Sequence, residues 1–200
     1  MGHTRAAPDD AGRADLVLDS TAPRCLSSSI EVRTLFLLLV TTLALGCGSA
    51  SLPQSIPHPL LDQAPEPLEE MGLDGEMISF PKKGEVTVVD FWSTNCKPCV
   101  KMMPAIETLY EGRKGSGVTV IGVAVDDNPG LVQKRLKEIG VTYPNVLDDP
   151  ASSLRGTYQV DELPQTFIFD KTGHLRVVTK GGEETDIGII QDAVDVLAAE

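Results

Sequence analysis

The sequence predicts an α/β fold in which a mixed β-sheet is flanked by helices. A nearly continuous run of β-branched and aromatic residues, Val86–Trp92, is typical of a central strand buried on both faces. Strand-like and helix-like segments alternate after this run, and the chain closes with a hairpin followed by a helix. Because a hairpin pairs its strands antiparallel and strand-helix-strand units pair theirs parallel, we expect both kinds of pairing in one sheet.

The first half of the domain is predicted from turn and strand signals. Asp74-Gly75 indicates a turn beside a hairpin arm at residues 77–80, since glycine adopts the positive φ that such a turn needs. The central strand is followed by a helix over residues 102–111. An apolar strand over residues 118–125 comes next.

The second half begins with an amphipathic helix over residues 131–139. Val132, Leu136 and Ile139 are spaced four and three apart, which places them on one helix face. The remaining expected segments are a strand at 145–147, a short helix at 151–158, strands at 166–169 and 175–179, and a last helix lined by Ile187, Ile190, Val194 and Leu197.

Composition excludes several classes of function. The 200 residues include 17 Lys and Arg against 29 Asp and Glu, a formal net charge of −12. Such a chain lacks the cationic surface that a phosphate backbone requires, so nucleic-acid binding is disfavoured. Four cysteines and three histidines are too few for a disulfide scaffold or a rich metal cluster. The length suits one domain with tails, which we expect to be monomeric.

The N-terminal part is predicted to be a leader and a tether. Residues 1–34 are polar and lack apolar periodicity, which indicates disorder, and residues up to 31 are candidates for being untranslated, with Val32 as the true start. The apolar run within residues 35–47 is shorter than the ~20 residues that span a bilayer. It predicts a secretory signal, with a buried core helix or an uncleaved anchor as alternatives. Residues 48–69 hold five prolines and predict an extended tether, leaving residues 70–200 as the domain.

Cys47 follows this apolar run directly. The order Ala44-Leu45-Gly46-Cys47 resembles the lipobox of bacterial lipoproteins, although Ala and Leu stand in reverse order. The resemblance implies that Cys47 is the lipid attachment site and that the mature chain is tethered to a membrane.

The other chemically distinctive motif is Cys96-Lys97-Pro98-Cys99, which directly follows the central strand and opens a helix. Two intervening residues on a first helical turn bring the two sulfurs within bonding range. Unpaired amides and the helix macrodipole favour a thiolate at this position, so Cys96 is the expected nucleophile and Cys99 the resolving thiol. A zinc site needs two further ligands, for which only His58 and His174 remain, and a copper-chaperone site would need a different cysteine spacing.

Several segments together resemble the thioredoxin superfamily and, more narrowly, the exported TlpA/ResA-like thiol-disulfide oxidoreductases. The run Val89–Cys99 is similar to the strand and active-site motif of that family, and Pro104 matches its helix-kinking proline. Leu163–Phe167 matches the segment whose proline, here Pro164, is cis and lies against the disulfide. The resemblance implies a thioredoxin-like fold with an extra helix and strand between the third strand and this proline. It covers about residues 70–200.

The resemblance also implies roles for the neighbours of the two cysteines. Asp90 matches a buried carboxylate and is a candidate general base for Cys99, while Gly122 stands where thioredoxin places the lysine partner of that carboxylate. The expected modulators of the motif are Lys97, Pro98 and Trp92, and the expected substrate-binding residues beside Pro164 are Leu163 and Gln165.

These inferences predict a membrane-tethered thiol-disulfide oxidoreductase that reduces protein disulfides through Cys96 and Cys99. Expected partners are protein thiols and disulfides, with apocytochrome thiols in cytochrome c maturation as candidates, and a membrane electron donor that recharges the pair. No organic cofactor and no metal are expected, and the location is the periplasmic or extracytoplasmic side of a bacterial membrane. The alternatives are a thiol peroxidase of the peroxiredoxin-related type and a metal-binding or metal-delivery lipoprotein.

Overall fold

The computed structural model describes residues 51–126, 128–148 and 153–200. The predictions for the leader (1–34), for the signal (35–47) and for Cys47 lie outside these residues. No helix of the described part is long and apolar enough to cross a membrane.

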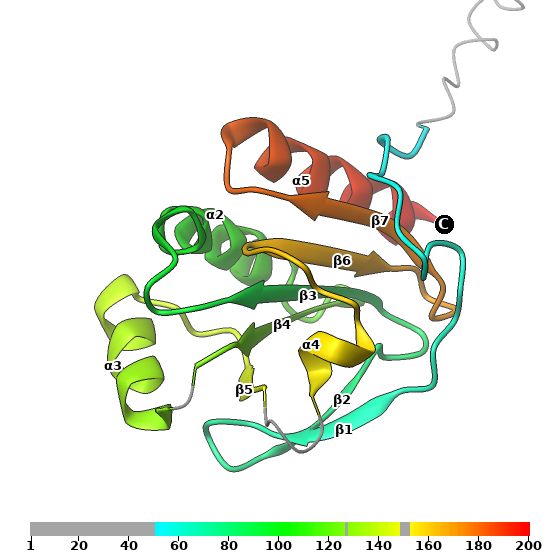
Figure 1. The fold of residues 1–200 in the computed structure, drawn as a ribbon. Helices are drawn as coiled ribbons and strands as arrows, with labels where there is room; N and C mark the ends of the chain where they lie inside the picture. The colour runs from blue at the N-terminus through cyan, green and yellow to red at the C-terminus, as the bar shows by residue number, and fades with distance from the viewer. Residues whose placement is uncertain (1–50, 127, 149–152) are drawn as a thin grey trace, which may run out of the picture. The chain divides into compact units, whose positions relative to one another are not determined.

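The domain is built on a five-stranded mixed sheet with strand order β5-β4-β3-β6-β7 (Figure 1). Its strands are β3 (Val86–Trp92), β4 (Val118–Ala124), β5 (Asn145–Leu147), β6 (Gln165–Phe169) and β7 (Leu175–Lys180). β3 pairs parallel with β4, and β4 with β5, while β6 and β7 add antiparallel. Every residue of β3 is buried, as its nearly continuous run of β-branched and aromatic residues predicts for a strand covered on both faces. The predicted α/β fold with a mixed sheet is confirmed.

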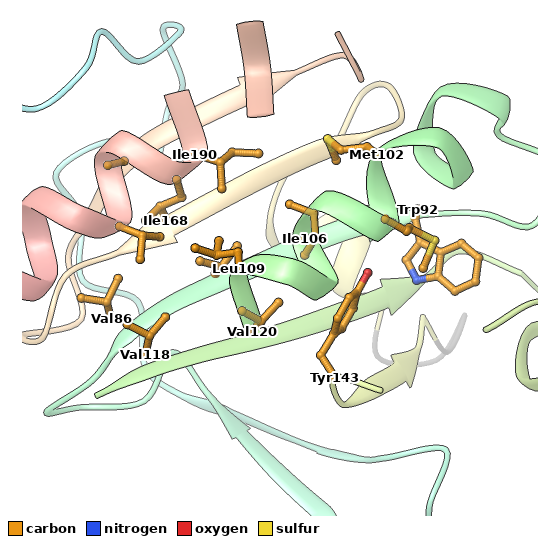
Figure 2. Packing of buried hydrophobic residues seen from close by; sticks show 14 of the residues in the cluster. Val86, Trp92, Met102, Ile106, Leu109, Val118, Val120, Tyr143, Ile168 and Ile190 are labelled. Atoms are coloured by element: carbon orange, nitrogen blue, oxygen red, sulfur yellow. The ribbon is translucent and has the colours of Figure 1, made fainter. Parts of the chain in front are cut away.

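Two buried clusters cover the two faces of the sheet. On one face α2 (Lys97–Arg113) and α5 (Glu184–Ala199) pack against alternate residues of the strands, as Figures 1 and 2 show, and α3 (Pro129–Ile139) adds Val132. The other face carries five buried aromatic rings and the short helix α4 (Leu154–Thr157). Because strand side chains alternate between faces, Val88 and Trp92 lie under α2, whereas Val89 and Phe91 face α4.

Helix boundaries are set by capping residues that the apolar pattern does not reveal. α3 starts two residues before its predicted start because the Asn128 side chain accepts a hydrogen bond from the Leu131 backbone and Pro129 takes the first turn. It ends at Gly140 in the left-handed conformation. α2 starts five residues before the predicted start at residue 102, immediately after Cys96.

A separate two-stranded sheet precedes the central strand. β1 (Leu68–Met71) and β2 (Met77–Phe80) form the hairpin that Asp74-Gly75 predicts, with φ at Gly75 equal to 89°. The hairpin is attached to the main sheet through a bridge between Gly72 and Val146 of β5.

The prediction of a free tether over residues 48–69 is corrected for the part that the structure describes. The backbone amide of Ile56 donates to the Val178 carbonyl at 3.1 Å, and Asp62 donates to Leu175 at 2.8 Å, so this segment runs along β7. Ile56, Leu60 and Leu61 pack against the aromatic cluster. Burial of these apolar side chains lowers the free energy more than solvation of the proline-rich backbone would.

His58, in the same segment, packs against the main sheet. Its ring meets the ring of Phe167 edge-on with centroids 5.2 Å apart, and its Nδ1 accepts the Leu60 amide at 3.2 Å. Burial is the main cause that lowers the pKa of His58 below its usual value. This histidine therefore anchors the segment to the sheet.

Candidate active site

A disulfide joins Cys96 and Cys99 at the start of α2, with Cα atoms 5.3 Å apart. Cys96 is the helix N-cap, and its sulfur accepts the Cys99 backbone N–H at 3.2 Å. Cys96 is partly exposed, whereas Cys99 is fully buried in the cluster beneath α2. The two sulfurs are therefore unequal, because only Cys96 is accessible to another molecule. A thiolate formed at Cys96 would accept the same helix N–H group that its sulfur accepts here.

The loop that carries Cys96 is fixed by a carboxylate from the next strand. Asp126, just beyond β4, accepts hydrogen bonds from the Thr94 backbone N–H at 2.9 Å and from the Thr94 hydroxyl at 2.7 Å. The ends of β3 and β4 meet here because the strands are parallel. Sequence analysis missed Asp126 as a member of the site, although its position directly after a parallel strand was a usable signal.

Beneath α2, one level of the sheet is lined by small and polar residues on all five strands. Thr179 pairs with Thr166, Thr166 with Asp90, Asp90 with Gly122 and Gly122 with Asn145. These five residues, which we call the polar row, lie on the same face as Val88 and Trp92, the face that α2 and the disulfide cover. The polar row is the only interruption of an otherwise apolar layer among the described strand residues of this face.

Asp90 is the charged member of the polar row. Its side chain is fully buried, and its Oδ1 accepts the Thr166 hydroxyl at 2.8 Å. Its Oδ2 has no hydrogen-bond partner among the described residues. Burial raises the pKa of Asp90 to about 7, against a smaller lowering effect of the Thr166 hydrogen bond. A carboxyl group with this pKa exchanges protons readily near neutral pH.

Gly122 and Asn145 form the other half of the polar row. The Asn145 amide lies over Gly122, where its Oδ1 accepts the Trp92 indole N–H at 2.9 Å and its Nδ2 donates to the Tyr143 carbonyl at 2.9 Å. A β-carbon at position 122 would lie only 2.0 Å from Asn145 Oδ1. Asn145 therefore excludes any side chain at this position, including the lysine that thioredoxin has there. Trp92, an expected modulator, is fully buried and donates this hydrogen bond, and its modulating role stays a prediction.

We expect Gly122→Ala to destabilise the chain by about 2–4 kcal/mol, because a displaced Asn145 leaves buried polar groups unpaired. Urea unfolding of the full chain measures this difference. Gly112→Ala is the matched control, since its added methyl group meets no atom within 4 Å on α2. In an Asn145→Ala background the added cost of Gly122→Ala should largely disappear. An equal cost in both backgrounds would contradict the steric explanation.

Leu163 and Pro164 in the loop before β6, and Gln165 at the start of β6, lie in different environments. The Leu163–Pro164 peptide bond is cis, and the Pro164 carbonyl accepts the Gly181 amide at 3.0 Å. Leu163 is half-buried between the two clusters. Gln165 is fully buried and accepts the Asp161 amide at 3.3 Å, so its side chain supports the loop. The expected substrate-binding role of Leu163 and Gln165 stays a prediction.

Two further segments border the disulfide. A β-carbon at Gly182 would lie 2.7 Å from the Pro98 carbonyl oxygen, so the loop after β7 approaches the motif closely. On the other side, a pocket of about 320 Å³ is lined by Thr94, Asn95, Lys97, Val100, Lys101 and Arg135. Lys97 and Pro98 are exposed.

Within the described ranges, no three His, Cys, Asp or Glu side chains are grouped closely enough to hold a metal ion.

The fold and the site define a class: a thioredoxin-like domain with a two-cysteine disulfide at the start of the helix that follows its central strand. The model of the AhpC/TSA family matches residues 61–178, and the chain belongs to this family. The resemblance to ResA-like proteins is also confirmed. The chain is 37% identical over 115 residues to the thiol-disulfide oxidoreductase ResA of Bacillus cereus, covering 56% of this chain and 65% of that protein.

One further relative and two solved structures point to the same class of protein. The chain is 29% identical over 119 residues to sporulation thiol-disulfide oxidoreductase A of Bacillus subtilis, covering 58% of this chain and 67% of the relative. Among solved structures, a thiol:disulfide interchange protein described as DsbE from Chlorobium tepidum superposes with a TM-score of 0.61 at 25% identity, covering 74% of this chain and 99% of that one. StoA from Bacillus subtilis gives 0.56 at 25% identity, with 66% and 99% covered. The chain spans a little under two thirds of the length of the ResA relative.

Proposed function

We propose that this protein is a thiol-disulfide oxidoreductase that reduces disulfides in other proteins. The observation that carries the proposal is the asymmetric pair at the start of α2, a partly exposed Cys96 and a buried Cys99. The similarity to ResA and StoA supports the same class of activity. Asp90, on the sheet face beneath this pair, is suited by its pKa of about 7 to accept a proton from Cys99.

The proposed reaction starts from the reduced dithiol. The Cys96 thiolate attacks a substrate disulfide, one substrate sulfur leaves as a thiolate, and a mixed disulfide forms. Cys99 then gives its proton to Asp90 and attacks the Cys96 sulfur. This forms the Cys96–Cys99 disulfide and releases the second substrate thiolate. Two electrons pass to the substrate, and a thiol-bearing electron donor must return two electrons and two protons.

The reduction potential of the purified full chain, equilibrated in glutathione buffers, tests the direction of transfer. We expect a reduction potential of about −270 mV, the value of thioredoxin. A reduction potential of about −120 mV, as in a strong oxidant, would reverse the proposed direction. Failure to reduce a protein disulfide such as those of insulin, together with no dithiol titration, would overturn the activity itself.

We further propose that Cys47 carries a lipid that holds the domain on the extracytoplasmic face of a bacterial membrane, where a membrane electron donor recharges it. The support is the lipobox-like sequence ending at Cys47 and the apolar run before it. Intact mass of the protein extracted from membranes should show a diacylglycerol-modified N-terminus at Cys47. A mature N-terminus elsewhere, or an unmodified cysteine, would contradict the anchor.

Thiol peroxidase activity is the second candidate, because the family model that matches the chain is the AhpC/TSA model. Hydrogen peroxide consumption by the reduced chain, with the same preparation, distinguishes the two activities. Rapid peroxide turnover that depends on Cys96, in the absence of protein disulfide reduction, would favour the peroxidase.

A further inference from the structure

The pocket beside the disulfide is positively charged, although the chain as a whole has a net charge of −12. Its walls come from the loop before α2, the start of α2 and α3, and Figure 1 shows α3 close to the end of β3 from which α2 begins. Three of its six lining residues are Lys or Arg, and no Asp or Glu of the described part lines it. We call it the cationic pocket, lined by Thr94, Asn95, Lys97, Val100, Lys101 and Arg135.

Two of the three cations come from the first turns of α2. Lys97 and Lys101 are four residues apart, so they lie on one face of the helix. Both are exposed, whereas Cys99 on the opposite face is buried. The ion pairs of the described residues include neither lysine. The first turn of α2 contains no acidic residue either, so its positive end is not offset from within the helix.

Arg135 supplies the third cation from α3. Its Nη1 donates to Glu138 at 3.0 Å, and the same carboxylate pairs with Lys134 at 3.9 Å. One carboxylate therefore serves two cations, and this part of α3 keeps a positive charge. A guanidinium group has five N–H donors, and the Arg135 Nε has no hydrogen-bond partner among the described residues. Arg135 thus retains donors for a further acceptor.

Other carboxylates near the disulfide do not neutralise the cationic pocket. Asp126 accepts two hydrogen bonds from Thr94 and is committed to holding the loop. Glu184 lines a second pocket, between α2 and α5, which it shares with Lys101. That second pocket contains one cation and one anion, so the two sides of α2 differ in charge. The excess positive charge beside the disulfide is confined to the side that faces α3.

A substrate joined to Cys96 must pass next to the cationic pocket, because the two chain neighbours of Cys96, Asn95 and Lys97, both line it. In a mixed disulfide the substrate sulfur is about 2 Å from the Cys96 sulfur. Each further residue of the substrate spans at most about 3.6 Å. A side chain one or two residues from the substrate cysteine therefore reaches the pocket. Its volume of about 320 Å³ is at the lower end of the ~300–1,000 Å³ of small-ligand sites and suits one side chain.

We infer that the cationic pocket receives an acidic side chain of the substrate, a Glu or Asp one or two residues from the cysteine that Cys96 attacks. Lys101 and Arg135 are then specificity-determining residues. The substrate carboxylate takes no part in the electron transfer. It speeds the encounter and holds the substrate disulfide beside Cys96 through charge attraction. This inference rests on the proposed function and adds the class of substrate, proteins with an acidic residue beside the disulfide.

The test compares two model peptides, each a disulfide-linked dimer with one cysteine per chain. In one peptide the cysteine is flanked on both sides by Glu residues, and in the other by Gln residues. The rate constant for reduction of each peptide by the reduced full chain is divided by the rate constant with dithiothreitol, which removes the intrinsic difference between the peptides. We expect the Glu peptide to react about 10-fold faster at low ionic strength. High salt should abolish this preference, because it screens exposed charges.

Variants of the pocket locate the preference. Lys101→Gln and Arg135→Gln should each lower the Glu preference about 3-fold, and the double variant should remove most of it. Lys134→Gln is the matched control, because it also removes a cation of α3 and a partner of Glu138 but lies outside the pocket. Its preference should stay within about 1.5-fold of the parent. A substitution that only disturbed the disulfide would slow both peptides alike and leave their ratio unchanged.

The outcomes separate this inference from the proposed function. Equal normalised rate constants for the two peptides would overturn the inference and leave the proposed function intact. A Glu preference that persists in the double variant would also overturn it, since another part of the chain would then recognise the carboxylate. If the reduced chain reduced neither peptide, the proposed function would fail, and the inference with it.

Discussion

Cys99→Ser is expected to abolish repeated reduction of protein disulfides, with a loss on the order of 10³-fold or more in turnover. The variant keeps Cys96, which is partly exposed and can still attack a substrate disulfide. It lacks the buried sulfur that releases the substrate, so Cys96 remains covalently bound to it. Nonreducing electrophoresis followed by mass spectrometry should therefore recover stable mixed disulfides through Cys96 and identify the bound proteins.

The matched comparison uses the other cysteine of the pair. Cys96→Ser should lose the same turnover but form no mixed disulfide, because Cys99 is fully buried. Gly112→Ala on α2, whose added methyl group meets no atom within 4 Å, is the control and should retain full turnover and trap nothing. If Cys96→Ser formed mixed disulfides as readily as Cys99→Ser, the assignment of the attacking and resolving sulfurs would be reversed.

Asp90→Asn is expected to stabilise the fold at pH 8 by up to about 4 kcal/mol while leaving its stability at pH 4 almost unchanged. The cause is the buried carboxyl group, whose pKa is raised from 3.8 to about 7 mainly by burial. The folded chain therefore holds this proton more tightly than the unfolded chain does. As the pH rises through this interval, the unfolded chain loses the proton first, and the free energy of unfolding falls until the folded chain is ionised as well.

The measurement is urea unfolding of both chains across pH 4 to 8. Asn keeps an oxygen acceptor for the Thr166 hydroxyl, so the variant removes the charge and preserves that hydrogen bond. Hydrogen bonds lower the pKa values of Glu85, Asp161 and Asp170, so these three groups make the fold more stable as the pH rises. Because variant and parent both contain them, their contribution cancels in the stability difference between the two chains. Asp192→Asn on the exposed side of α5 is the control, expected to change stability by less than about 0.5 kcal/mol. A stability difference that does not vary with pH would contradict the buried, ionisable Asp90.

Much of the secondary structure was predictable because it depends on local patterns. The apolar run at residues 86–92 and the spacing of Val132, Leu136 and Ile139 each identify an element from side chains close in sequence. Errors occurred at the ends, as in α3, where Asn128 and Pro129 set the start through capping. The segment around Ile56 was misassigned because its proline content was weighed and its burial against β7 was not visible.

The sequence by itself determined the α/β order of elements and the position of Cys96 and Cys99 between a buried strand and a helix, since both follow from local spacing. Only the tertiary structure decided the environment of that pair. Asp90 receives its hydrogen bond from a residue 76 positions away, and Trp92 donates to one 53 positions away. Such partners are brought to one level by the register of the sheet, and that register depends on the packing of both faces at once. For this reason the pair of cysteines could be identified from the sequence, whereas the polar row beneath it could not.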